Sequence, residues 1–134
     1  NKISLYNPSD YMLLDYATKR NLEISFTMQD GNREGSLISI LDKTNTAMGG
    51  RLLKQWISAP LIKIESILQR QSAIAELSEN KTLRNNLTSE LKEIGDLERL
   101  ISKVCTGRAN PREIVLNKEA LTESELPKQL IGFN

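Results

Sequence analysis

Histidine is absent from the 134 residues, and Cys105 is the single cysteine. The chain therefore lacks the commonest general base and the commonest zinc ligand, and a lone cysteine forms neither an internal disulfide nor a metal cluster. The sequence has no G-x-x-x-x-G-K-[ST] phosphate loop, no apolar run near the ~20 residues that span a bilayer, and no signal-peptide core. We expect no catalytic residue, no cofactor, no metal and no membrane contact in this chain, and a cytoplasmic location.

Aromatic residues are also scarce, at 4%, so leucine, isoleucine and alanine must supply most of any core. Hydrophobic residues make up 39% and charged residues 26%, values that suit a globular chain. Lysine and arginine total 18 against 17 acidic residues, for a net charge of +1. A domain that grips DNA by itself usually has a clear basic excess, so the charge balance disfavours an independent DNA-binding domain.

Amphipathic segments separated by short breaks make up most of the chain. Apolar residues recur at spacings of three and four, which is typical of helices with one buried face. Residues 1–14 instead alternate and contain a turn signal, which indicates an extended lead-in. The pattern predicts an all-α fold, an irregular multi-helix bundle with a short extended N-terminal lead-in, and helices near residues 15–24, 36–42, 44–60, 63–79, 83–94, 96–106 and 111–125.

Several residues are suited to begin or end these helices. Side chains that accept hydrogen bonds from a first helical turn precede four of the segments, at Asp15, Ser36, Asp96 and Asn110. Gly107 follows a clean apolar stripe and is expected to stop that helix. Gly95 is expected at a helix C-terminus in the left-handed conformation that glycine adopts without steric cost.

Trp56 and Cys105 both fall on apolar helix stripes. An exposed tryptophan can stack on bases, and a thiol can be reactive. Burial in the core is the favoured interpretation for both residues.

A basic cluster lies near the Cys105 helix, at Arg99, Lys103, Arg108 and Arg112. It suggests weak phosphate contacts. Acidic neighbours dilute the positive field, so a solvated or ion-paired face is the favoured interpretation.

Four segments carry family motifs in order. Residues 14–24, LDYATKRNLEI, resemble the L-D-x-x-T-x-R-N-L-E signature that opens the core domain of MutS proteins. Residues 35–61 resemble the next stretch, with S-L-x-x-x-L-D, T-x-M-G-x-R-L-L, W and P-L elements. Residues 64–77 and 95–113 are similar to the I-x-x-R-x-x-A-V segment and to the D-L-E-R-L and P-R-D elements, with Ile74 and Pro-Arg-Glu as mild departures.

The resemblance covers about residues 11–116 and implies that residues 1–134 are a single fragment, the first part of the helical core or lever domain (domain III) of a MutS-type mismatch repair ATPase. The ATPase, mismatch-binding and clamp domains would lie elsewhere in a parent chain. That parent would be a homodimer that binds ATP and Mg²⁺, binds mismatched double-stranded DNA, and associates with the nucleoid. The fragment would link the DNA-contacting regions to the ATPase without being an enzyme itself.

No candidate catalytic residue accompanies the polar residues of these motifs, so the resemblance favours structural or interdomain roles for them. These candidates are Asp15, Thr18, Arg20, Asn21, Glu23, Asp96 and Arg99. A more specific hypothesis is that the segment from Arg20 to Glu23 couples the domains. Two alternatives stay open: an independent helical nucleic-acid-binding domain that uses the Arg99–Arg112 region, and a generic protein-interaction module.

Overall fold

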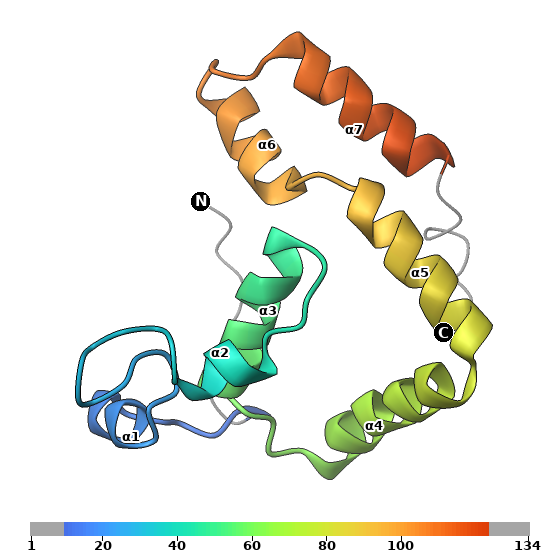
Figure 1. The fold of residues 1–134 in the computed structure, drawn as a ribbon. Coiled ribbons are helices and arrows are strands. Elements are labelled where there is room, and N and C mark those ends of the chain that lie inside the picture. The colour runs from blue at the N-terminus through green and yellow to red at the C-terminus, as the bar shows by residue number, and fades with distance from the viewer. Residues whose placement is uncertain (1–9, 124–134) are drawn as a thin grey trace. The chain divides into compact units, whose positions relative to one another are not determined.

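The computed structural model describes residues 10–123, and within that range the chain forms seven helices and no named strand (Figure 1). The predicted all-α class is confirmed. The helices are α1 (Tyr16–Asn21), α2 (Leu37–Leu41), α3 (Ala47–Ser58), α4 (Ile64–Glu79), α5 (Lys81–Glu93), α6 (Leu97–Cys105) and α7 (Pro111–Glu123).

The extended lead-in is confirmed for the part of it that the structure describes; residues 1–9 lie outside the described range. Tyr11 forms an isolated antiparallel bridge with Leu61, just after α3. Beside the bridge, Lys63 Nζ lies 2.7 Å from Asp10 Oδ1. The lead-in is therefore fastened to the segment between α3 and α4 by backbone pairing and by one ion pair.

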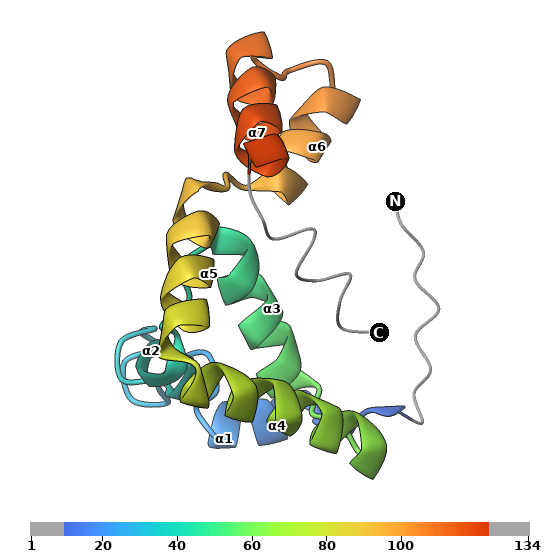
Figure 2. The ribbon, with the colours of Figure 1, turned by 90° about the vertical axis from the view of Figure 1, so that its right-hand side faces the viewer.

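The described chain forms two compact units, residues 10–43 with 50–76, and residues 44–49 with 77–123. In the first unit, the buried residues Ile24, Ser36 and Ile38 gather where α1 meets α2. In the second unit, α6 and α7 lie side by side in both Figure 1 and Figure 2 and pack against one another. None of the described helices has the length and apolar character needed to cross a membrane.

Capping side chains set the helix starts as the sequence predicts at Asp15, Ser36, Asp96 and Asn110, whereas the cap of α5 at Asn80 was not predicted. In each of the following pairs, a backbone N–H of the first turn donates to the side chain of the capping residue: Thr18 to Asp15, Ser39 to Ser36, Leu83 to Asn80, Arg99 to Asp96 and Arg112 to Asn110. Gly107 has a φ of 67° just after α6, so the predicted stop is confirmed.

The expectation for Gly95 is wrong. Its φ lies outside the left-handed region, and α5 ends instead with Ile94 in an extended conformation. The glycine is needed for a different reason: the side chain of Asn117 occupies the space where a Cβ would stand.

Burial of Trp56 and Cys105 is also not observed. Trp56 is 39% exposed, and the guanidinium of Arg70 lies 3.8 Å from the centre of its ring. Cys105 is exposed at the end of α6. Both residues do lie on apolar stripes, but the described helices cover only part of one another's apolar faces.

Candidate functional site

The signature that opens the chain folds into α1 and its capping residue. Asp15 Oδ1 accepts a hydrogen bond of 2.6 Å from the backbone N–H of Thr18. Hydrogen bonding to Thr18 stabilises the ionised carboxylate and lowers the pKa of Asp15 below its ordinary value. These contacts are local to the helix, so the aspartate and the threonine of the signature define where α1 begins.

Glu23 reverses the chain after α1. Its φ is 48°, which makes it the only non-glycine residue with a positive φ in the described range. Its carboxylate Oε1 accepts a hydrogen bond of 2.5 Å from the backbone N–H of Met28. The glutamate of the signature therefore closes the loop after α1 through both its backbone and its side chain.

The reversed chain then pairs with the start of α2. The carbonyls of Glu23 and Ile24 accept hydrogen bonds of 3.0 Å from the N–H groups of Leu37 and Ile38. Ile24 is 3% exposed, Ile38 is 2% exposed, and Ser36 is fully buried. This α1–α2 junction is the tightest packing in the described chain, and both of its ends carry family motifs.

Arg20 and Asn21 lie on the outside of the junction, and both are exposed. Within residues 10–123, neither side chain has a hydrogen-bond or ion-pair partner. The junction thus holds two polar groups of the signature toward solvent, where they are available to a surface outside the described residues.

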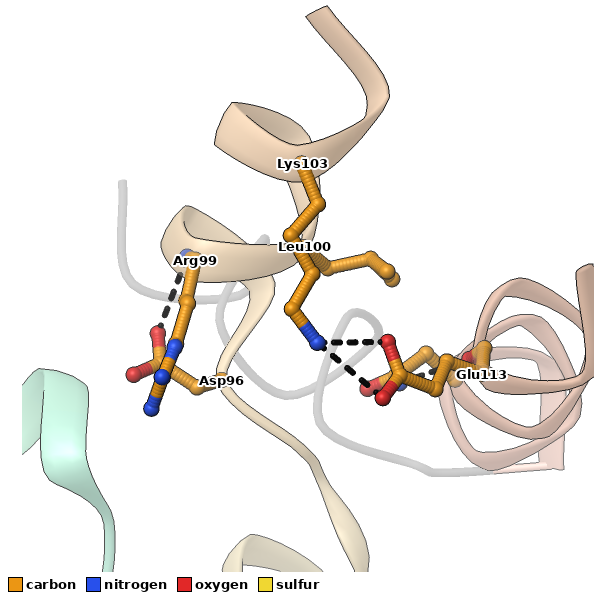
Figure 3. Close-up of a pocket in the computed structure, with 6 residues that line it drawn as sticks. Asp96, Arg99, Leu100, Lys103 and Glu113 are labelled. Carbon is orange, nitrogen blue, oxygen red and sulfur yellow. Dashed lines mark hydrogen bonds and ion pairs between the residues drawn. The ribbon is translucent and has the colours of Figure 1, made fainter. Parts of the chain in front are cut away.

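The second group of predicted residues lines a hollow of about 220 Å³ between α6 and α7 (Figure 3). Lys103 Nζ lies 3.0 and 2.8 Å from the two carboxylate oxygens of Glu113 and joins the helices. Asp96 caps α6, and the side chain of Arg99 runs beside it, away from the Lys103–Glu113 pair (Figure 3). The arrangement joins two helices through an ion pair and places a capped helix start beside it.

The basic cluster is therefore divided. The favoured interpretation, an ion-paired face, is confirmed for Lys103. Arg108 and Arg112 are exposed, and their guanidinium groups have no partner within the described range. Phosphate contacts by these two arginines stay a prediction.

Asn117 was missed because in the sequence it only interrupts the apolar stripe of the last helix. In the structure it is half-buried, lines the hollow and fills the space beside Gly95. A polar residue on an apolar stripe, with a glycine in a predicted break, was the available signal. Among the described residues, no cluster of three or more acidic or cysteine side chains could hold a metal ion.

Comparison with known proteins identifies the chain's relatives. A family model described as MutS domain III matches residues 17–133. The DNA mismatch repair protein MutS of Pelotomaculum thermopropionicum is 45% identical over 131 residues, which cover 98% of this chain and 15% of that protein. The MutS of Bacillus subtilis is 43% identical over 130 residues, covering 97% of this chain and 15% of the relative. The chain spans about 15% of the length of these relatives. It therefore belongs to the MutS family, and the part of that family it matches is domain III.

Proposed function

We propose that this chain is a core or lever segment of a MutS-type mismatch repair protein, a mechanical link between DNA-contacting regions and an ATPase. One observation carries the proposal. Every described helix except α5 exposes at least one large hydrophobic side chain, while the buried hydrophobic residues of the described chain are only Ile24 and Ile38. A domain that worked alone would cover more of this surface.

The parent protein would supply the chemistry. The relatives are named as DNA mismatch repair proteins, so we propose that the parent binds mismatched double-stranded DNA, hydrolyses ATP with Mg²⁺ and acts as a homodimer. The present chain would contribute no catalytic group and bind no cofactor. Its helices would transmit motion between the DNA-contacting regions and the ATPase.

The α1–α2 junction is the proposed point of attachment. A link transmits motion only if its ends are stiff, and the junction combines two capped helices with backbone pairing and the most buried side chains. From this base Arg20 extends into solvent. An arginine presents five donors in a fixed planar arrangement, which suits recognition of a carboxylate on another domain.

Replacement of Arg20 in the full-length protein tests the proposal. Arg20→Ala should slow ATP-dependent release from mismatched DNA and leave the thermal transition unchanged, because the side chain has no partner within residues 10–123. Lys19→Ala is the matched control, since Lys19 is the neighbouring cation on the same helix and the signature does not specify it. Normal release by the Arg20 variant at normal stability would contradict a coupling role.

Direct nucleic-acid binding is a second candidate, because Arg108 and Arg112 are exposed cations without partners in the described range. Each phosphate contact contributes to the salt dependence of DNA binding, about one unit of slope per neutralised phosphate. Arg108→Ala with Arg112→Ala in the full-length protein should leave the slope unchanged if the chain is a lever. A slope reduced by about one or two units would instead favour direct contact.

A further inference from the structure

The joint between α5 and α6 contains a glycine that backbone conformation does not require. Gly95 lies between the two helices, and its φ is outside the left-handed region. A Cβ placed on it would lie 2.4 Å from Asn117 Oδ1 and 3.1 Å from the Asn117 Cγ. A side chain at position 95 is therefore excluded because the Asn117 side chain of α7 already occupies that space.

The orientation of the Asn117 carboxamide is fixed by a hydrogen bond. Its Nδ2 donates to the carbonyl of Glu113 one turn earlier, at 2.8 Å. That bond turns Oδ1 toward the joint, where the oxygen is buried and has no hydrogen-bond partner. Within the described range, the N–H of Gly95 also lacks an acceptor. The unpaired oxygen thus lies where a Cβ of Gly95 would stand, and a buried acceptor in this state favours any small shift that brings a donor to it.

A second contact fastens the same two helices further along. Lys103, near the end of α6, pairs with Glu113 at the start of α7. The Glu113 carbonyl is also the acceptor that orients Asn117. The two fastenings are coupled through one residue and act on opposite ends of α6.

We propose that Asn117 is the positioning residue of a latch that seats the α5–α6 joint against α7, so that α6 and α7 move as one rigid arm. Gly95 is the matching half of the latch, because its missing side chain leaves the space that the carboxamide occupies. This inference goes beyond the lever role and does not depend on it, since the latch needs neither DNA nor ATP.

The test is a double-mutant cycle in the full-length protein, read by amide hydrogen exchange of α6 without DNA or nucleotide. Gly95→Ala should speed exchange across residues 97–105 by about tenfold, since the new methyl group displaces Asn117. Adding Asn117→Ala should remove the clash, so that exchange in the double variant matches that in Asn117→Ala alone. Asn85→Ala is the control for helix propensity, because Asn85 is an exposed asparagine in α5 with no partner in the described range.

Independent effects of the two substitutions would overturn the proposal, as would exchange in Gly95→Ala equal to that of the unaltered protein. If Gly95→Ala does not fold, the double variant decides the matter. Folding restored by Asn117→Ala supports the latch, and failure of the double variant to fold contradicts it.

Discussion

Substitutions of Glu23 separate two opposing contributions to the stability of the α1–α2 junction. The residue has a φ of 48°, a conformation that is unfavourable for any side chain with a Cβ. Its carboxylate also accepts the N–H of Met28 at 2.5 Å. Glycine relieves the first effect and loses the second, whereas alanine keeps the unfavourable backbone and loses the hydrogen bond as well.

Magnitudes decide the order of the variants. A left-handed non-glycine residue destabilises the folded chain by about 1–2 kcal/mol. Replacing it with glycine removes that cost, but the greater conformational freedom of glycine in the unfolded chain offsets roughly 0.5–1 kcal/mol of the gain. A hydrogen bond to a charged group contributes about 1.5–3 kcal/mol, and the lower end applies here because Glu23 is only half-buried. Glu23→Ala should therefore cost about 1.5 kcal/mol, and Glu23→Gly about 1 kcal/mol less than that.

Hydrogen exchange of residues 37–41 in the full-length protein measures this difference, because those amides depend on pairing with the carbonyls of Glu23 and Ile24. A difference of about 1 kcal/mol is roughly a fivefold change in protection. Glu23→Gln keeps an acceptor and should fall nearest to the unaltered protein. Alanine as stable as glycine would refute the backbone part of the reasoning, and alanine as stable as glutamate would refute the hydrogen-bond part.

Three further predictions concern the other fastenings. The lowered pKa of Asp15 means that its ionised form stabilises α1 above its ordinary pKa of 3.8, so this stability should be lost as pH falls further and exchange in residues 16–21 should rise, an effect absent in Asp15→Ala. Ser36→Ala should lower the stability of α2 by about 1–2 kcal/mol in denaturant titrations, because the buried hydroxyl caps the helix and donates to the Arg33 carbonyl. Lys103→Glu should loosen α6 from α7 by under about 1 kcal/mol, as expected for a partly exposed ion pair, and adding Glu113→Lys should recover most of that loss.

Local chemistry made the helices predictable. Asp15, Ser36 and Asp96 are capping residues whose partners lie three positions along the chain, so the information needed to place them is contained in a few neighbouring letters. The stop at Gly107 is equally local, because only its own backbone conformation is involved. These three helix starts and this helix end therefore followed from the sequence without knowledge of the fold.

Contacts between elements were not predictable in the same way. The sequence assigned Gly95 a left-handed conformation, the common reason for a glycine after a helix, but the actual reason is a side chain 22 positions further on. The predicted burial of Trp56 was wrong for a related reason. An apolar stripe shows that a helix face favours burial, but not whether the surface that buries it belongs to the same chain. For Lys103 the sequence predicted only that nearby acidic residues favour ion pairing, without naming Glu113 as the partner. The register of α6 against α7 decides the partner, and the sequence of either helix alone does not determine that register.

The distribution of packing in the described residues agrees with the proposed role of a link. Ile24, Ile38 and Ser36 are buried at one junction, where backbone pairing already holds α1 to α2, and an ion pair with a close side-chain contact holds α6 to α7. Large hydrophobic residues are exposed on every described helix except α5, and burying such a side chain is worth about 1.5–3 kcal/mol. Stiffness is thus supplied locally, by specific pairs, while the hydrophobic driving force is left on surfaces that other parts of a larger protein can cover. Under the proposed lever role, a chain arranged in this way would transmit a displacement between neighbours without rearranging a core of its own.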